Sequence, residues 1–236
     1  MEQEFIFREV ELDTHQKNRI CVESSNSVLV LDFDHTLFLS NSTEEYLDCA
    51  RPKFLVAIAL AFIEGLKPWK LLPGDNSRFL YRDAIRVLTI TILFPWTLVF
   101  WHLKSRSLVD RYRNQDLLDI MQNEQWEKVI LASNGFLFIL IPLLKNFRIN
   151  RYTVLATKIT NLFQGIRKKG KLSLLEQAIG YESLKSATFI TDNIEDQPLL
   201  DAVNQPLRLV WPEARHFRAC ENIYVPFVYT EDRKST

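Results

Sequence analysis

The sequence is poor in cysteine and carries no net charge. Its three cysteines, Cys21, Cys49 and Cys220, are odd in number and far apart, which argues against a disulfide framework and against a cysteine-based zinc site. Lys plus Arg and Asp plus Glu each total 29, so the chain as a whole has no field that would attract nucleic acid. We therefore expect a protein of the reducing cytoplasm that does not bind nucleic acid.

The N-terminus lacks the features of a signal peptide. Residues 1–10 alternate acidic and apolar side chains, whereas a signal peptide has a basic region followed by an apolar run. This absence also favours the cytoplasm as the location.

Five short apolar runs rich in β-branched residues have the composition of buried parallel strands. They are Ser27–Phe33, Lys128–Ala132, Tyr152–Ala156, Thr188–Thr191 and Leu207–Trp211. Helix-length stretches such as Phe136–Asn146 and Lys171–Ile179 separate most of them. This alternation predicts an α/β fold with a doubly wound, Rossmann-like parallel sheet.

The strand–helix alternation is interrupted between the first and second strands. From residue 38 to residue 120 the patterns are helical, with aromatic and aliphatic clusters, which predicts a helical cap inserted after the first strand. The expected division is an N-terminal extension at 1–26, a discontinuous catalytic core at 27–37 and 121–236, and the cap at 38–120.

Carboxylates follow two of the predicted strands, at the edge where a doubly wound sheet binds its ligands. Asp32 and Asp34 end the first run, and Asp192 and Asp196 follow the fourth. Burying like charges together is costly unless a cation lies between them. Mg²⁺ prefers oxygen ligands and shares its shell with substrate phosphates, so the predicted metal site consists of Asp32, Asp192 and the backbone carbonyl of Asp34.

Groups suited to a phosphate lie at the same edge. Ser133 and Asn134 follow the second predicted strand and offer a hydroxyl and backbone N–H groups. The segment 167–171 adds cations, among which Lys168 and Lys169 compete with Lys171. We favour Lys171 because Leu172, Leu175 and Ile179 follow it with helical spacing, so that this lysine opens a helix at the edge of the sheet.

These segments resemble the four motifs of the haloacid dehalogenase-like superfamily. The motifs are Asp-x-Asp-x-Thr at Asp32–Thr36, a strand-terminal serine at Ser133, a helix-opening lysine at Lys171 and an Asp-x-x-x-Asp loop at Asp192–Asp196. The resemblance implies that Asp32 is the nucleophile, Asp34 the general acid and base, and Asp192 a magnesium ligand. It also implies that Ser133 and Lys171 hold phosphate and that Thr36 and Asp196 support the site.

The inserted helices are similar to the first type of cap in the phosphoserine phosphatase-like branch of this superfamily. More narrowly, residues 37–52, the cap and residues 171–180 resemble phosphatase domains fused to UbiA-type prenyltransferases. Two positions depart from the usual pattern, because His35 and Thr191 stand where most members have glycine.

The predicted cap combines basic and apolar segments. Residues 51–115 contain 11 basic residues and 4 acidic ones, and Val87–Leu103 is free of Lys, Arg, Asp and Glu over 17 residues. A single membrane crossing there is excluded, because the strands before and after it must join one sheet, and Phe54–Ile63 is too short for a second crossing. A hairpin that dips into one leaflet and a cap with its own apolar core both remain.

The combined motifs predict a magnesium-dependent phosphatase that acts through an aspartyl-phosphate. Its expected substrate is a phosphorylated small molecule or a lipid phosphate, with peripheral contact between the cap and the inner face of a membrane. Transfer of the phosphoryl group to another acceptor would use the same residues. The alternative from another class is a catalytically silent binding or membrane-scaffold module.

Overall fold

The computed structural model describes residues 28–71, 77–123, 126–149, 151–161, 166–209 and 228–230. The predicted N-terminal extension at residues 1–26 lies outside these ranges. The described strands form one sheet in the order β3-β2-β1-β4-β5-β6. Their bounds are Val28–Leu31 for β1, Lys128–Phe136 for β2, Thr153–Thr157 for β3, Thr188–Thr191 for β4, Gln205–Leu209 for β5 and Val228–Thr230 for β6.

The first five strands are parallel, as predicted. Most of them begin or end a few residues away from the predicted runs. β4 has the predicted bounds, whereas β2 continues to Phe136 through an irregular stretch after Ala132. β5 begins two residues earlier than predicted, and Trp211 lies outside the described residues. The antiparallel edge strand β6 was not predicted.

Helices cover both faces of the sheet, which confirms the doubly wound α/β class. Alternate residues of β1 point to opposite faces, so that Leu29 and Leu31 join one apolar core and Val28 and Val30 join the other. Helix α6 (Leu137–Phe147) lies on the first face. The second face carries α7 (Ile166–Ile179), α8 (Tyr181–Lys185) and α9 (Gln197–Leu200).

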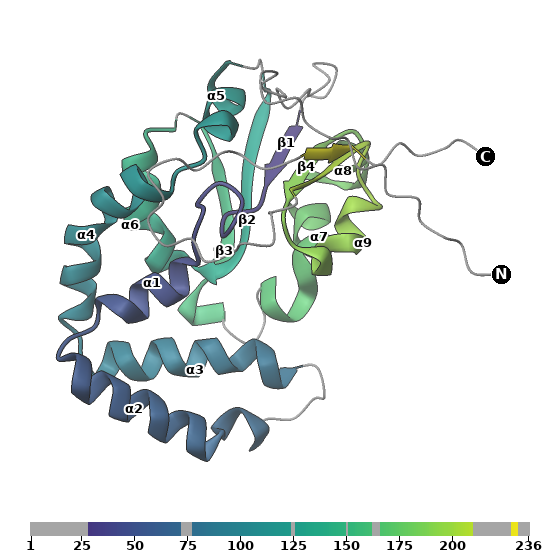
Figure 1. Cartoon of the computed structure of the whole chain (residues 1–236). Coiled ribbons are helices and arrows are strands. Elements are labelled where there is room, and N and C mark those ends of the chain that lie inside the picture. The colour runs from purple at the N-terminus through teal and green to yellow at the C-terminus, as the bar shows by residue number, and fades with distance from the viewer. Residues whose placement is uncertain are drawn as a thin grey trace.

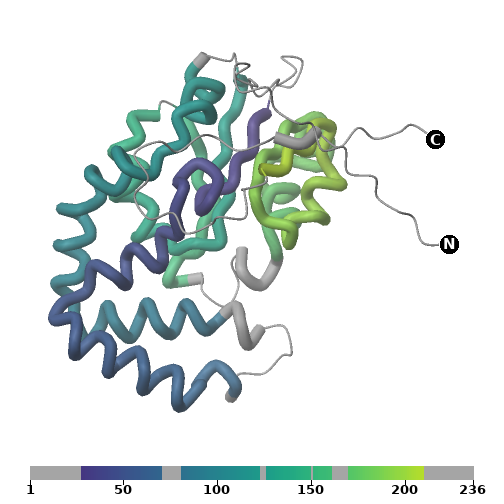
Figure 2. The backbone as a smooth tube through the Cα atoms, viewed as in Figure 1, coloured from purple at the N-terminus to yellow at the C-terminus, as the bar shows by residue number. Residues whose placement is uncertain are grey.

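The chain between β1 and β2 is helical, as predicted. It contains α1 (Ser42–Cys49), α2 (Lys53–Leu66), the 3₁₀ turn η1 (Pro68–Leu71), α3 (Ser77–Leu93), α4 (Thr97–Tyr112) and α5 (Gln115–Asn123). Helix α4 packs along α6, where the indole N–H of Trp101 donates to the carbonyl of Ile139 at 2.9 Å. Figures 1 and 2 show α2 and α3 side by side beyond the carboxyl ends of the strands. The exact boundaries of core and cap stay a prediction.

The uncharged run Val87–Leu103 forms parts of two helices. Helices α3 and α4 meet at 113° across a short break that contains Pro95. Within the described residues no single helix is long and apolar enough to cross a membrane. The bent pair reaches that length and apolar composition only when its two helices are counted together. Phe94 and Trp101 are buried while Ile92 and Leu103 are exposed, so the run contributes both to the core and to the surface.

Candidate active site

The loop after β1 places Asp32 inside the protein at the carboxyl edge of the sheet. Asp32 is buried, with 6% of the residue exposed. Its backbone N–H continues the ladder to Ile190 of β4 at 2.9 Å, and its Oδ1 accepts the N–H of Phe33 at 2.7 Å. These bonds fix both the backbone and the carboxylate of the predicted nucleophile.

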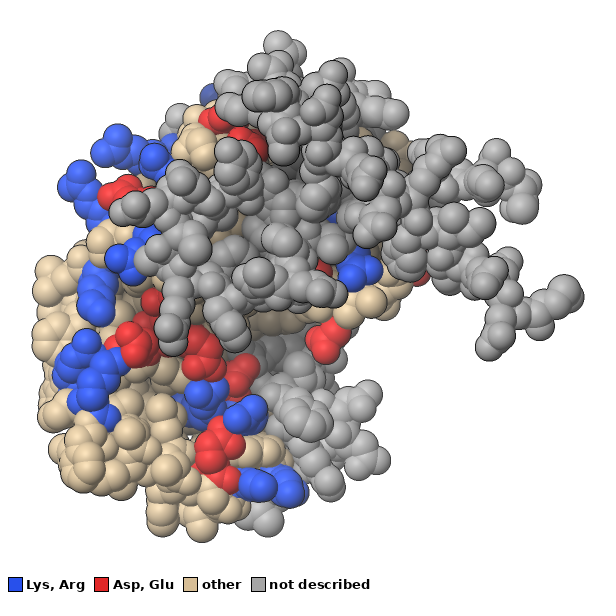
Figure 3. Space-filling view, viewed as in Figure 1, with Lys and Arg blue, Asp and Glu red and all other residues tan. Residues whose placement is uncertain are grey.

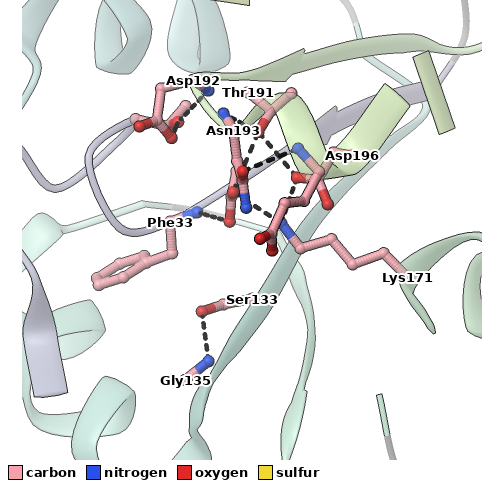
Figure 4. Close-up of polar contacts among 11 residues, drawn as sticks. Phe33, Ser133, Gly135, Lys171, Thr191, Asp192, Asn193 and Asp196 are labelled. Carbon is pink, nitrogen blue, oxygen red and sulfur yellow. Dashed lines mark hydrogen bonds and ion pairs between the residues drawn. The ribbon is translucent and has the colours of Figure 1, made fainter. Parts of the chain in front are cut away.

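Lys171 contacts this carboxylate from helix α7, and Figure 4 shows its side chain beside Asp196. Helix α7 is interrupted at Gly170, whose φ of 80° no helix adopts, so Lys171 begins the second helical piece. Its Nζ lies 2.7 Å from Asp32 Oδ2 and 2.6 Å from Asp196 Oδ2. Burial lowers the pKa of Lys171, but the two carboxylates outweigh burial and leave this pKa raised. The ammonium group therefore stays charged beside the predicted nucleophile.

This arrangement places Lys171 beside Asp32, and its role in binding phosphate stays a prediction. The side chains of the competing Lys168 and Lys169 lie outside what the structure describes. Asp196, predicted to support the site, binds Lys171 directly.

Asp34 lies at the start of the inserted helices. Its Oδ1 accepts the backbone N–H of Ser42, the first residue of α1, at 2.7 Å. Burial and the negative charge of Asp32 raise the pKa of Asp34 to about 6, while the bond from Ser42 opposes the rise. A carboxyl group with such a pKa can both give and take a proton near neutral pH.

Asp192 is held against the first loop by Thr36. The Thr36 hydroxyl lies 3.2 Å from Asp192 Oδ1 and accepts the backbone N–H of Asp192 at 3.1 Å. Burial and, as a smaller cause, the nearby negative charge of Asp32 raise the pKa of Asp192 to about 6. Thr36 thus links the first loop to Asp192, and its supporting role stays a prediction.

The donor set suits Mg²⁺, although no cluster of three His, Cys, Asp or Glu side chains among the described residues is arranged to hold a metal ion. The predicted site needs only two carboxylates, from Asp32 and Asp192, because Asp34 contributes its backbone carbonyl. A divalent cation between the two carboxylates would relieve their repulsion, and oxygen atoms are the ligands that Mg²⁺ prefers.

Ser133 and Gly135 lie in the irregular last part of β2, on the same edge of the sheet. Ser133 is buried, and its Oγ accepts the backbone N–H of Gly135 at 2.9 Å. Asn134 is exposed, and its backbone carbonyl oxygen accepts a hydrogen bond from the hydroxyl of Thr157 at 3.1 Å. The predicted phosphate roles of Ser133 and Asn134 stay predictions.

A family model described as haloacid dehalogenase-like hydrolase matches residues 29–201 of the chain. This range includes every predicted site residue and well over half of the sequence. The chain belongs to this family.

Solved structures are similar to this chain at low sequence identity. A protein of unknown function from Bordetella pertussis Tohama I is 17% identical, with a TM-score of 0.54, over 77% of this chain and 89% of that chain. A phosphoserine phosphatase described as a phospho-aspartyl intermediate analogue is 14% identical, with a TM-score of 0.41, over 75% and 83% of the two chains. No curated protein sequence matches. The narrower resemblance to domains fused to UbiA-type prenyltransferases stays a prediction.

Thr191 gives this hydrolase a contact that a glycine at the same position would not provide. Its hydroxyl lies 3.1 Å from Asp32 Oδ2 and 2.9 Å from Asp196 Oδ2, and it accepts the backbone N–H of Asn193 at 3.1 Å. The hydroxyl has one proton and donates to one carboxylate at a time. Sequence analysis identified Thr191 only as a departure from the motif, whereas the structure makes it a positioning residue for the acidic loop.

His35, the other departure, has the backbone conformation that glycine favours. Its φ is 56°, and an L-residue in this left-handed region costs about 1–2 kcal/mol relative to the right-handed one. The loop is held by the bond from His35 N–H to the carbonyl of Ser40 at 3.3 Å. The left-handed backbone therefore explains why glycine is frequent at this position of the motif. In this chain His35 adopts the same backbone conformation with some strain.

Gly135 is a site residue that sequence analysis missed, and we expect Gly135→Ala to reduce turnover by about tenfold or more. A Cβ there would lie 3.1 Å from Ser133 Oγ and 3.5 Å from Asp34 Oδ2, so the methyl group would fill the space between the predicted phosphate-binding hydroxyl and the predicted general acid. Steady-state hydrolysis of a chromogenic phosphate ester gives the measurement.

Gly65→Ala is the matched control, because a Cβ at Gly65 has no neighbour within 4 Å. Gly65 lies in α2, where alanine should stabilise the helix by about 0.5–1 kcal/mol without affecting activity. If Gly135→Ala and Gly65→Ala are equally active, the phosphoryl group does not bind between Ser133 and Asp34.

Proposed function

We propose that this protein is a magnesium-dependent phosphatase that hydrolyses a phosphate monoester through a phosphorylated Asp32. The observation that carries the proposal is the buried Asp32 carboxylate, paired with Lys171 at 2.7 Å. Two further carboxyl groups, of Asp34 and Asp192, lie near it, and burial together with the charge of Asp32 raises the pKa of each to about 6. Membership of the hydrolase family supports it. This combination of a carboxylate nucleophile, a proton carrier and a phosphate-binding cation is what phosphoryl transfer to an aspartate requires.

The first chemical step forms a bond between an Asp32 oxygen and phosphorus and breaks the bond from phosphorus to the leaving oxygen. Asp34 in its protonated form donates its proton to that oxygen. Lys171 and the Ser133 hydroxyl bind the phosphoryl oxygens and offset their charge. When bound at Asp32, Asp192 and the Asp34 carbonyl, Mg²⁺ supplies further positive charge and lets the anionic nucleophile approach an anionic phosphate.

The second step releases inorganic phosphate. Asp34, now ionised, takes a proton from water, and the hydroxyl attacks phosphorus while the bond to Asp32 breaks. Asp34 thereby regains the proton that it lost, and Asp32 returns as a carboxylate.

The substrate proposal includes both soluble and lipid phosphate monoesters. Both classes carry the phosphoryl group that the site needs. The inserted helices α2 and α3 lie beyond the carboxyl ends of the strands (Figure 1), the side on which we propose that the leaving group binds. A lipid phosphate as the substrate would place this hydrolase at the inner face of a membrane. A screen of metabolite phosphates against lipid phosphates, with Mg²⁺ and with a chelator, identifies the leaving group and tests the metal requirement.

We expect Asp34→Asn to lower steady-state turnover by about a hundredfold or more, because the general acid and base is lost. Asparagine keeps an oxygen that accepts the bond from Ser42, so the loop should stay folded. With a leaving group that departs without a proton, such as nitrophenolate, Asp32 should still be phosphorylated, and the intermediate should accumulate because no base activates water. Mass spectrometry of the acid-quenched variant measures the phosphate on Asp32.

Glu195→Gln is the control, because Glu195 is an exposed member of the same acidic loop and should have normal activity. Normal turnover of Asp34→Asn would remove Asp34 from the mechanism. If the unmodified protein hydrolyses no phosphate ester with Mg²⁺ and never carries phosphate on Asp32, the silent binding module is the better description.

A further inference from the structure

Helix α2 turns a charged residue toward the protein and large apolar residues toward solvent, whereas a surface helix usually does the opposite. Its only charged residues are Lys53 and Glu64. Glu64 faces α3, where it pairs with Arg82 at 2.8 Å, and Val56 and Ile63 are the buried apolar contacts. The opposite, solvent-facing side carries large apolar side chains, namely Phe54, Leu55, Ile58, Phe62 and Leu66, of which Phe54 is 74% exposed and Phe62 66%.

The corner between α3 and α4 extends this apolar surface. Ile92, Leu93, Trp96, Val99, Phe100 and Leu103 are exposed there. The indole N–H of Trp96 donates to the backbone carbonyl of Arg51 at 2.7 Å, which places the corner beside the first turn of α2. We call these residues and the five on α2 together the outer surface.

The outer surface is where exposed apolar side chains gather. Among the described residues it includes every exposed large hydrophobic side chain except Leu98, Ile141, Ile159, Tyr181 and Ile194. Figure 3 shows a broad uncharged area over α2, with charged groups along the side toward the rest of the molecule. The apolar face of a helix is normally buried in protein or in lipid, and exposed apolar patches of this kind mark interaction sites.

Basic residues border the outer surface at both ends. Lys67 and Lys70 follow the end of α2, and Lys104 and Arg106 follow the corner. All four are exposed, and none forms an ion pair with another residue in the described ranges. Their charge is complementary to the headgroups of anionic lipids.

We propose that the outer surface docks on an anionic lipid bilayer, with the α2 side chains and the α3–α4 corner entering the interfacial layer. Phe, Leu and Ile side chains gain free energy in that layer, and Trp96 is of the residue type that favours it. The basic border binds the headgroups around the inserted side chains. The outer surface contains no residue of the candidate active site, so this docking does not depend on the proposed chemistry.

A bilayer fits this surface better than a second copy of the chain. In a two-fold dimer the same patch meets itself, so the basic borders of the two copies would approach each other. Acidic lipids instead supply the opposite charge. The exposed side chains of α2 lie opposite Glu64, which faces α3, and α2 lies apart from the sheet in Figure 2, so docking leaves hydrolysis of a soluble ester unchanged.

Vesicle co-sedimentation of the full chain tests the proposal, with phosphatidylcholine vesicles compared with mixed phosphatidylcholine and phosphatidylglycerol vesicles. We expect binding to the anionic vesicles, weaker at high salt. Replacing both Phe54 and Phe62 with serine should weaken this binding by about tenfold or more, because two exposed rings no longer enter the lipid. Lys67→Gln with Lys70→Gln should weaken binding to the anionic vesicles and leave binding to the neutral ones unchanged.

The matched control replaces Ile141 and Tyr181, exposed apolar residues outside the outer surface, with serine and should bind as the parent does. All variants should hydrolyse a soluble phosphate ester at the parental rate, which shows that they are folded. Failure of the parent to sediment with either vesicle would overturn the proposal. Binding of the Phe54 and Phe62 variant equal to that of the parent would also overturn it. A third contradicting result is a dimer of the parent that becomes a monomer in this variant, because a second copy of the chain would then cover the outer surface.

Discussion

We expect Asp32→Asn to lower turnover by about a thousandfold or more, because the amide cannot attack phosphorus. The asparagine carbonyl can still accept the N–H of Phe33 in place of Asp32 Oδ1. Lys171 loses one carboxylate but keeps Asp196 at 2.6 Å, so its charge stays paired. The free energy of unfolding should fall by only about 1–3 kcal/mol, the usual cost of a lost hydrogen bond to a charged group.

Two measurements on this variant separate a lost nucleophile from a lost fold. Thermal unfolding should give a single cooperative transition, and mass spectrometry after acid quenching should find no phosphate on the protein. Asn193→Ala is a useful comparison, since its side chain caps the acidic loop by accepting the N–H of Glu195 at 2.9 Å without contributing to the chemistry. Residual activity of Asp32→Asn above about a tenth of the parent would exclude Asp32 as the covalent nucleophile.

The parallel sheet could be predicted because buried strands leave a clear pattern in the sequence. β4 is apolar or β-branched along its whole length and buried at every position, and its predicted bounds are correct. β2 was predicted to end at Ala132, where the apolar run ends, and the following Ser133, Asn134 and Gly135 are of the residue types that favour turns. Pairing with β3 carries the strand on to Phe136 through an irregular register, and local turn preference cannot reveal such a tertiary contact.

The candidate site was predictable in its residue types and less so in its contacts. The order of the motifs placed Asp32, Lys171 and Asp192 at one sheet edge, and the structure brings them together there. The bridge from Thr191 to two carboxylates depends on side-chain direction across two strands, which a linear motif does not encode. Gly135 was missed for a similar reason, because its importance lies in the neighbours that a Cβ would meet.

The surface of the inserted helices was the hardest feature to predict. The run Val87–Leu103 is uniformly uncharged, yet Trp101 is 1% exposed and Ile92 is 76% exposed. Helical periodicity gives the relative directions of side chains but does not tell which direction faces the core when every side is apolar. For α2 the sequence alone therefore could not show that Glu64 faces the protein and Phe62 faces outward.

Lys171→Met should lower stability more than any other single substitution considered, and it should also impair activity. Lys171 is 5% exposed and pairs with two buried carboxylates, so removing its charge leaves Asp32 and Asp196 uncompensated. Breaking a buried ion pair in this way costs about 3–5 kcal/mol of the free energy of unfolding. Hydrolysis should also fall by about a hundredfold or more, because the phosphoryl group loses a cation.

The stability loss of Lys171→Met should depend on pH. Burial raises the pKa of Asp196 in the folded protein, and the substitution removes the positive charge that opposes this rise. A carboxyl group whose folded pKa exceeds its unfolded value, about 4, stabilises the fold below that value and loses this contribution as pH rises through the folded pKa. The variant should therefore be most stable in acid and lose stability as the pH rises from about 4, which chemical denaturation at several pH values measures.

A second substitution distinguishes the structural role of Lys171 from its catalytic role. Combining Lys171→Met with Asp196→Asn removes one of the two buried charges that the first change leaves unpaired, so part of the lost stability should return. Activity should not return, because the phosphate-binding cation is still missing. Lys168→Met, three residues earlier, should be close to the parent in both properties. If Lys168→Met is instead the more damaging change to hydrolysis, the phosphate-binding lysine is Lys168, and the pairing of Lys171 with Asp32 and Asp196 serves the fold alone.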